Sequence, residues 1–178
     1  ALFESLGDRV WQGRALWAQA YAHYQLGQMR ERDRCGRASL ALARQSGDLE
    51  GIGAAANLLY REHADMAQRL QGLKESLAAF LSAGQIERAG ASLGNLSMAY
   101  GSIGLYARAR NPGGQGSAES LSALRQGSGY FASMLAAIEG HLGHAERARQ
   151  HANEAAAALA ENDDPWFIVI VQLVLGRA

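Results

Sequence analysis

The chain has 178 residues, one cysteine, and 17 basic lysines and arginines that balance 17 acidic aspartates and glutamates. With no net charge, no global field would steer it to nucleic acid or to an anionic membrane, so we expect neither partner. A single cysteine excludes an internal disulfide framework, and no signal peptide is found. Alanine is abundant and proline occurs only twice, so long helices are unhindered and we predict an all-α fold.

Glycines recur at regular intervals and divide the chain into helix-sized units. They are Gly7, Gly27, Gly47, Gly84, Gly104 and Gly143. Three intervals between them are 20 residues long, and the other two are 37 and 39. A helix of about 15 residues and a short turn fill the shorter interval, because glycine readily takes positive φ where a helix ends. The paired unit of 37 to 40 residues therefore predicts an α-solenoid of antiparallel helix hairpins.

The first hairpin is predicted over residues 7–46, with an A helix over 9–26 and a B helix over 28–46. Its A helix carries four large aromatic side chains, which exceed the needs of one buried stripe: Trp11, Trp17, Tyr21 and Tyr24. They either pack on neighbouring helices or partly line a concave groove, where amphipathic rings are good binding anchors.

The B helix of this hairpin interleaves arginines with acids. The charged residues are Arg30, Glu31, Arg32, Asp33, Arg34 and Arg37. We interpret them as a solvated face with internal ion pairs rather than a phosphate-binding cluster, because the acids offset the charge and no aromatic is interleaved. Cys35 lies on the side of the helix that should be buried, and we predict that it acts as a small hydrophobe.

The second hairpin is predicted over 47–83 and the third over 84–126. In the third A helix, Asn95 could grip a peptide main chain, because an amide supplies donor and acceptor together; helix capping or solvent exposure are the alternatives. The following B helix should stop near Arg110, since Pro112 and the glycines of 113–116 disfavour helix. We expect a mobile loop or a lid over the groove; no strand precedes it and no Gly-Lys-Ser/Thr follows, which argues against a phosphate-binding P-loop.

The fourth hairpin is predicted over 127–163, and a final A helix over 165–178. His141, His144 and His151 cluster in sequence but lack the further ligands of a zinc site, so we predict no metal. No catalytic set or cofactor motif is evident, and we expect no enzyme activity. The final helix is apolar on nearly all sides, so it should pack on a second copy or fold back onto the array. Its candidate interface residues are Trp166, Phe167, Ile170, Val171 and Val174.

The side chains around the turns resemble the tetratricopeptide repeat, whose motif is W-x2-L-G-x2-Y followed by small residues and a proline. Leu96 and Tyr100 have the spacing of its leucine and tyrosine, and Ser97 takes the place of its small glycine. The stretch from Gly143 to Ala148 fits the start of a B helix, and Pro165 fits the closing proline. The longer spacing is similar to the arrays of bacterial signalling proteins, such as MalT-type transcriptional activators and class III cyclases.

This resemblance implies a right-handed superhelix of about four repeats plus a C-terminal helix, spanning 1–178 as one domain. His23 and Glu139 stand where the motif has tyrosine. We expect a fragment of a longer cytoplasmic protein that binds a peptide or partner protein in its concave groove, within a bacterial signalling or transcription-regulating protein. A small-ligand sensor that controls an output domain and an oligomerisation arm are the alternatives. The candidate groove residues are Trp17, Tyr21, Tyr24, Leu58, Arg61, Asn95, Met98, Ser102, Met134 and His141.

Overall fold

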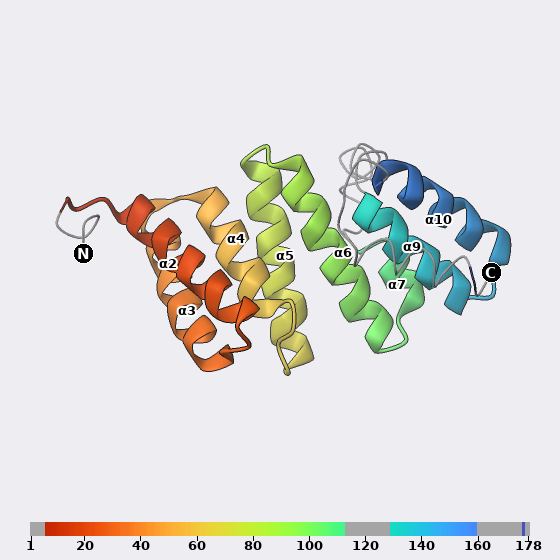
Figure 1. Ribbon diagram of the computed structural model, residues 1–178, viewed down its shortest axis with the longest axis horizontal. Helices are drawn as coiled ribbons and strands as arrows, with labels where there is room; N and C mark the ends of the chain where they lie inside the picture. The colour runs from red at the N-terminus through yellow and green to blue at the C-terminus, as the bar shows by residue number, and fades with distance from the viewer. Residues whose placement is uncertain (1–5, 113–128, 160–175, 177–178) are drawn as a thin grey trace. The chain divides into compact units, whose positions relative to one another are not determined.

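The computed structural model describes residues 6–112, 129–159 and 176, and its regular elements are helices (Figure 1). No strand occurs in these ranges, which confirms the prediction of an all-α fold. None of the helices described there is long and apolar enough to cross a membrane. The chain forms two compact units, Ala1–Gln85 and Ile86–Ala178, which are described separately below.

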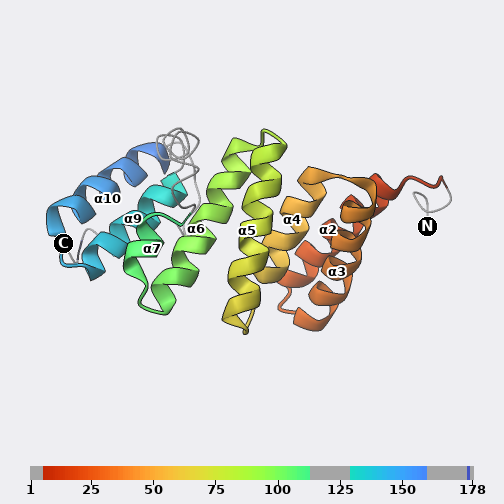
Figure 2. The ribbon, with the colours of Figure 1, turned by 180° about the vertical axis from the view of Figure 1, so that it is seen from behind.

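Unit 1 consists of two helix hairpins. Its helices are α2 (Arg9–Gln25), α3 (Met29–Ser46), α4 (Leu49–Tyr60) and α5 (Met66–Ser82). Each helix packs against the next along the chain, and α2 also packs against α4, so the two A helices are in direct contact (Figures 1 and 2). These bounds agree with the predicted helices to within a few residues.

Unit 2 begins with the third A helix. Its helices are α6 (Ile86–Ser102), α7 (Tyr106–Arg110), α9 (Gly129–His141) and α10 (Ala145–Leu159). The A helix α6 packs against both α7 and the next A helix α9, which in turn packs along α10. As predicted, the third B helix stops at Arg110, and Asn111 leaves the helical region with φ −137°. The predicted loop or lid lies from residue 113 onward outside the described residues.

The predicted turns are confirmed by the backbone. All six glycines of the repeating series have φ between 68° and 77°, the left-handed region in which side chains are strained. Gly47, for example, ends α3 as its C-cap, and α4 begins two residues later at Leu49. The glycine spacing therefore marks the true helix ends.

The two helices of each hairpin in unit 1 approach closely at a glycine, and a buried serine bridges them there. Ser39 Oγ in α3 donates a hydrogen bond of 2.8 Å to the carbonyl oxygen of Gly13 in α2. Ser76 Oγ in α5 donates a bond of 2.8 Å to the carbonyl oxygen of Gly53 in α4. Both serines are at most 1% exposed. The same serine–glycine contact is thus built twice, once in each hairpin.

The side chains of α3 have the predicted burial and ion pairs, with one exception. Cys35 is fully buried, as predicted, with its Sγ 3.9 Å from Gln19 Oε1. Arg34 and Arg37 form the expected ion pairs on the exposed face of the helix. The prediction of a solvated Arg32 is wrong: it is 7% exposed, and its Nε and Nη2 donate to Asp33 Oδ1 at 2.9 and 2.7 Å. Its position on the helix turns it inward, and the neighbouring carboxylate satisfies the charge there.

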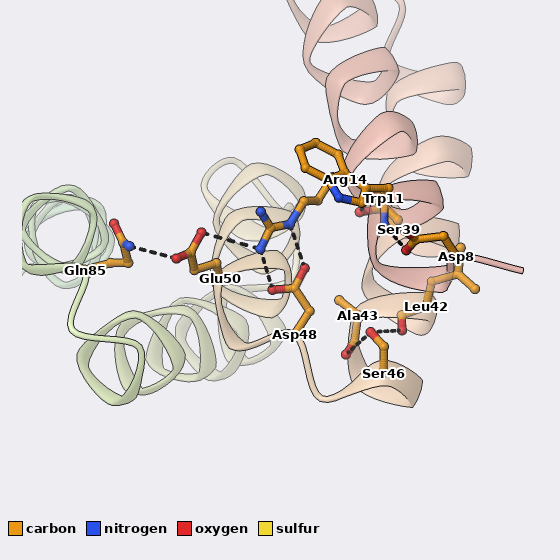
Figure 3. Close-up of polar contacts among 11 residues, drawn as sticks. Asp8, Trp11, Arg14, Ser39, Leu42, Ala43, Ser46, Asp48, Glu50 and Gln85 are labelled. Carbon is orange, nitrogen blue, oxygen red and sulfur yellow. Dashed lines mark hydrogen bonds and ion pairs between the residues drawn. The ribbon is translucent and has the colours of Figure 1, made fainter. Parts of the chain in front are cut away.

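A bidentate ion pair joins α2 to the start of α4 (Figure 3). Arg14 Nε and Nη2 donate to the two carboxylate oxygens of Asp48 at 3.0 and 3.1 Å. Arg14 Nη2 also lies 3.6 Å from Glu50 Oε2, and Glu50 Oε1 accepts a bond from Gln85 Nε2 at 2.8 Å. The hydrogen bond from Arg14 lowers the pKa of Asp48 below its ordinary value, against the opposing effect of burial.

The position of Gly53 leaves no room for a larger residue. A Cβ added there would lie 2.7 Å from two ring carbons of Phe80, whose side chain is only 2% exposed. We expect Gly53→Ala to lower the free energy of unfolding by about 1–3 kcal/mol, because overpacking outweighs the better helix propensity of alanine. Gly101→Ala is the matched control, since a Cβ there meets no atom within 4 Å, and it should stabilise the protein or leave it unchanged. Urea unfolding measures both; an unaltered midpoint for Gly53→Ala would contradict the packing.

The Arg14–Asp48 pair predicts a pH-dependent stability. Because the pKa of Asp48 is lowered by folding, its contribution is present above the ordinary pKa of aspartate and is lost as the pH falls through the folded value. We expect Asp48→Asn to cost about 1–3 kcal/mol at pH 7. The difference from the wild type should shrink as the pH is lowered below the ordinary aspartate range.

Urea unfolding at a series of pH values measures this effect. Glu31→Gln is a suitable control, since its ion pair with Arg34 is exposed on both sides and should contribute little to stability. A cost of Asp48→Asn that stays constant down to acidic pH would show that the ion pair does not stabilise the junction.

Candidate functional site

Three aromatic side chains of α2 form a continuous row, here called the α2 aromatic row: Trp17, Tyr21 and Tyr24. They recur at four and three residues, which places them on one face of the helix. The rings of Trp17 and Tyr21 stack at 5.6 Å between centroids with 20° between their planes. The rings of Tyr21 and Tyr24 are 6.4 Å apart and tilted by 36°. The contacts hold the three rings as one surface.

The row is anchored on one side and open on the other. Trp17 is half-buried and packs on the core of unit 1, beside Leu40 and Ala56. Tyr21 is 42% exposed, the most exposed ring of the row. The packing alternative is confirmed for Trp17, whereas Tyr21 offers its ring to solvent, and its role in a groove stays a prediction. Rings fixed by packing lose little conformational entropy when they bind a partner.

The last ring of the row contacts the end of the next A helix. Tyr24 OH donates a hydrogen bond of 2.9 Å to Glu62 Oε1, and the Arg61 guanidinium lies 5.1 Å from the centroid of the Tyr24 ring. Burial raises the pKa of the Tyr24 hydroxyl, and the bond to Glu62 raises it further, so the ring stays neutral and the hydroxyl keeps its donor role. Arg61 and Glu62 thus place a charged, hydrogen-bonding region at the Tyr24 end of the aromatic row.

Three other candidate groove residues are buried and present little surface to a partner. Leu58 is 4% exposed and packs with Ala20 and Cys35 in the core of unit 1. In unit 2, Asn95 is 5% exposed and Met134 is 8% exposed. The alternative of solvent exposure for Asn95 is wrong, because α6 is buried on most of its faces.

The remaining candidates in unit 2 are accessible but have different surroundings. Met98 is 45% exposed, and the exposed Ser102 donates its hydroxyl to the carbonyl oxygen of Ala99 at 2.9 Å. The exposed His141 stacks on Tyr106 with ring centroids 5.5 Å apart. The candidate interface residues of the final helix lie outside the described residues: Trp166, Phe167, Ile170, Val171 and Val174.

The structure also shows a charged cluster that sequence reasoning missed. Glu139 of α9 is 2% exposed, and its carboxylate contacts the side chains of Arg110, His144 and Arg147. The available signal was a glutamate in a position where the resembling motif has tyrosine. A buried carboxylate needs compensating charge, so a glutamate at this position predicts cationic partners on neighbouring helices. Within the described ranges, no group of three or more His, Cys, Asp or Glu side chains could hold a metal ion.

Comparisons of the chain with protein-family models, with curated proteins and with solved structures find no match.

Proposed function

We propose that the chain is an interaction module of the tetratricopeptide type, which binds a peptide or partner protein along the α2 aromatic row. The observation that carries this proposal is the row itself: Trp17 stacks on Tyr21 and Tyr21 contacts the tilted ring of Tyr24, with Tyr21 exposed and Trp17 packed on the core. Aromatic side chains of this kind dominate the binding energy of protein interfaces, since they bury a large area at a low cost in entropy.

The repeat architecture in this proposal is supported by the contacts within each unit. The serine–glycine contact recurs with a separation of 37 residues between Ser39 and Ser76. An A helix contacts the next A helix in both units, as α2 does α4 and α6 does α9. We extend these local features to a right-handed solenoid, in which A helices line a shared concave face.

The wider role follows from the same resemblance. We assign the module to a cytoplasmic signalling or transcription-regulating protein of a bacterium, in which it recruits a partner and does not itself catalyse a reaction. The longer repeat spacing supports this assignment. A homodimer through the final helix stays a separate prediction, since it depends on residues 165–178.

A peptide-display selection on the full chain tests the binding role. Selected peptides should bind with a measurable Kd and should lose at least about tenfold in affinity for Tyr21→Ala, a change of about 1.4 kcal/mol. Ile103→Ala is the matched control, because Ile103 is an exposed apolar residue of unit 2 with 45% exposure, and it should leave the affinity unchanged. Fluorescence anisotropy with labelled peptides measures all three proteins.

Two results would contradict the proposal. One is a selection that yields no peptide above background, and the other is a set of peptides whose affinity is the same for Tyr21→Ala as for the wild type. Circular dichroism and urea unfolding of Tyr21→Ala establish that any loss of binding occurs in a folded protein.

A further inference from the structure

Three segments of unit 2 meet at one buried carboxylate. Glu139 lies near the end of α9, Arg110 is the last residue of α7, His144 lies in the turn that follows α9, and Arg147 belongs to the first turn of α10. Together these four residues are called the Glu139 cluster. Arg110 Nε lies 2.9 Å from Glu139 Oε1, while His144 Nδ1 lies 2.6 Å from Oε2. Arg147 Nη1 lies 3.9 Å from Oε2.

The cluster carries more positive than negative charge. One carboxylate faces two guanidinium groups, which carry a permanent positive charge in proteins, so the cluster has an excess of positive charge. The other acids on α7, α9 and α10 do not cancel this excess. Glu146 is paired with Arg149 at 2.8 Å, and Glu154 is paired with His151 at 2.8 Å further along α10. The excess therefore stays at the end of unit 2 where α7, α9 and α10 converge.

The positive groups are accessible and the negative group is not. The side chain of Glu139 is 3% exposed, whereas those of Arg110 and Arg147 are 42% and 56% exposed. An anion that arrives from solvent would meet the guanidinium groups before the carboxylate. The attraction between this anion and the two guanidinium groups is therefore reduced less by Glu139 than the short distance between Glu139 and Arg110 would imply.

The carboxylate also orients Arg110 and lies close to Arg147. Arg110 uses Nε toward Oε1, and its two Nη groups have no other ion pair or hydrogen bond among the described residues. Arg147 makes one long contact, to Oε2. Arg110 is thus held at one oxygen of the carboxylate with donors to spare, and Arg147 lies near the other oxygen. The planar fork of such a group matches the oxygens of phosphate in a bidentate manner.

We propose that Arg110 and Arg147 form a binding site for a phosphate group, with Glu139 as the positioning residue. The site is independent of the α2 aromatic row, which lies in unit 1. Its ligand is a phosphate group, free or as a small monoester, whose negative charge the excess of the Glu139 cluster offsets in part.

Titration of the full chain with inorganic phosphate, followed by two-dimensional NMR at constant ionic strength, tests the site. Saturable shifts of the Gly143, His144 and Ala145 amide signals are expected, with a Kd of about 1 mM. Arg147→Gln should weaken binding about tenfold, whereas Arg149→Gln, two residues further along the same helix, should change it less than twofold. A parallel titration with O-phosphoserine tells a monoester from the free ion, and saturable binding of either supports the site.

Glu139→Gln distinguishes an oriented site from general attraction. The substitution raises the net charge of the cluster by one, so simple electrostatics predicts tighter binding of phosphate. A site that depends on oriented arginines instead predicts binding at least about threefold weaker. Circular dichroism checks that this variant is folded, and Arg147→Gln carries the test if it is not. Unsaturated shifts up to 20-fold above the expected Kd, or equal binding by Arg147→Gln and Arg149→Gln, would overturn the proposal.

Discussion

The close approach of paired helices at Gly13 and Gly53 is the constraint on which the rest of unit 1 depends. A glycine at each crossing removes the side chain that would separate the helices, and a serine of the partner helix occupies the contact. The hydroxyl is buried and must find an acceptor, because an unsatisfied buried donor costs about 1–3 kcal/mol. The glycine carbonyl supplies that acceptor. The spacing between helices, and hence the place of the α2 aromatic row over the core, follows from this one repeated bond.

In unit 2, an ion pair between Arg110 and Glu139 joins α7 to α9. The first B helix of this unit, α7, has five residues where α3 and α5 have 18 and 17. A helix of that length forms few internal hydrogen bonds and is not stable alone. Contacts from outside the helix replace what is missing: Ala109 is fully buried, and Arg110 binds the carboxylate of Glu139. The buried carboxylate of Glu139 thus ties this five-residue helix to the next hairpin.

The sequence predicted helix ends better than it predicted surfaces. Glycine acts locally, since positive φ excludes other side chains, so the turns and the stop at Arg110 followed directly from residue identities. Which face of a helix is exposed depends on every neighbour, and A helices in this chain contact several. Leu58 and Asn95 were therefore assigned to a groove although both are buried, and Arg32 was assigned to solvent. The Glu139 cluster joins residues that are up to 37 positions apart, which no local pattern reveals.

The brevity of α7 has a consequence for local dynamics. In a long helix, amide protons are protected from exchange partly by the helix itself, through its internal ladder of bonds. In α7 that protection comes almost wholly from the contacts made by Ala109 and Arg110. Its amides should therefore exchange in step with the opening of α9 from α6 and α7, as one cooperative unit rather than by fraying. The exchange rates of α7 thereby report the tertiary packing of α6, α7 and α9.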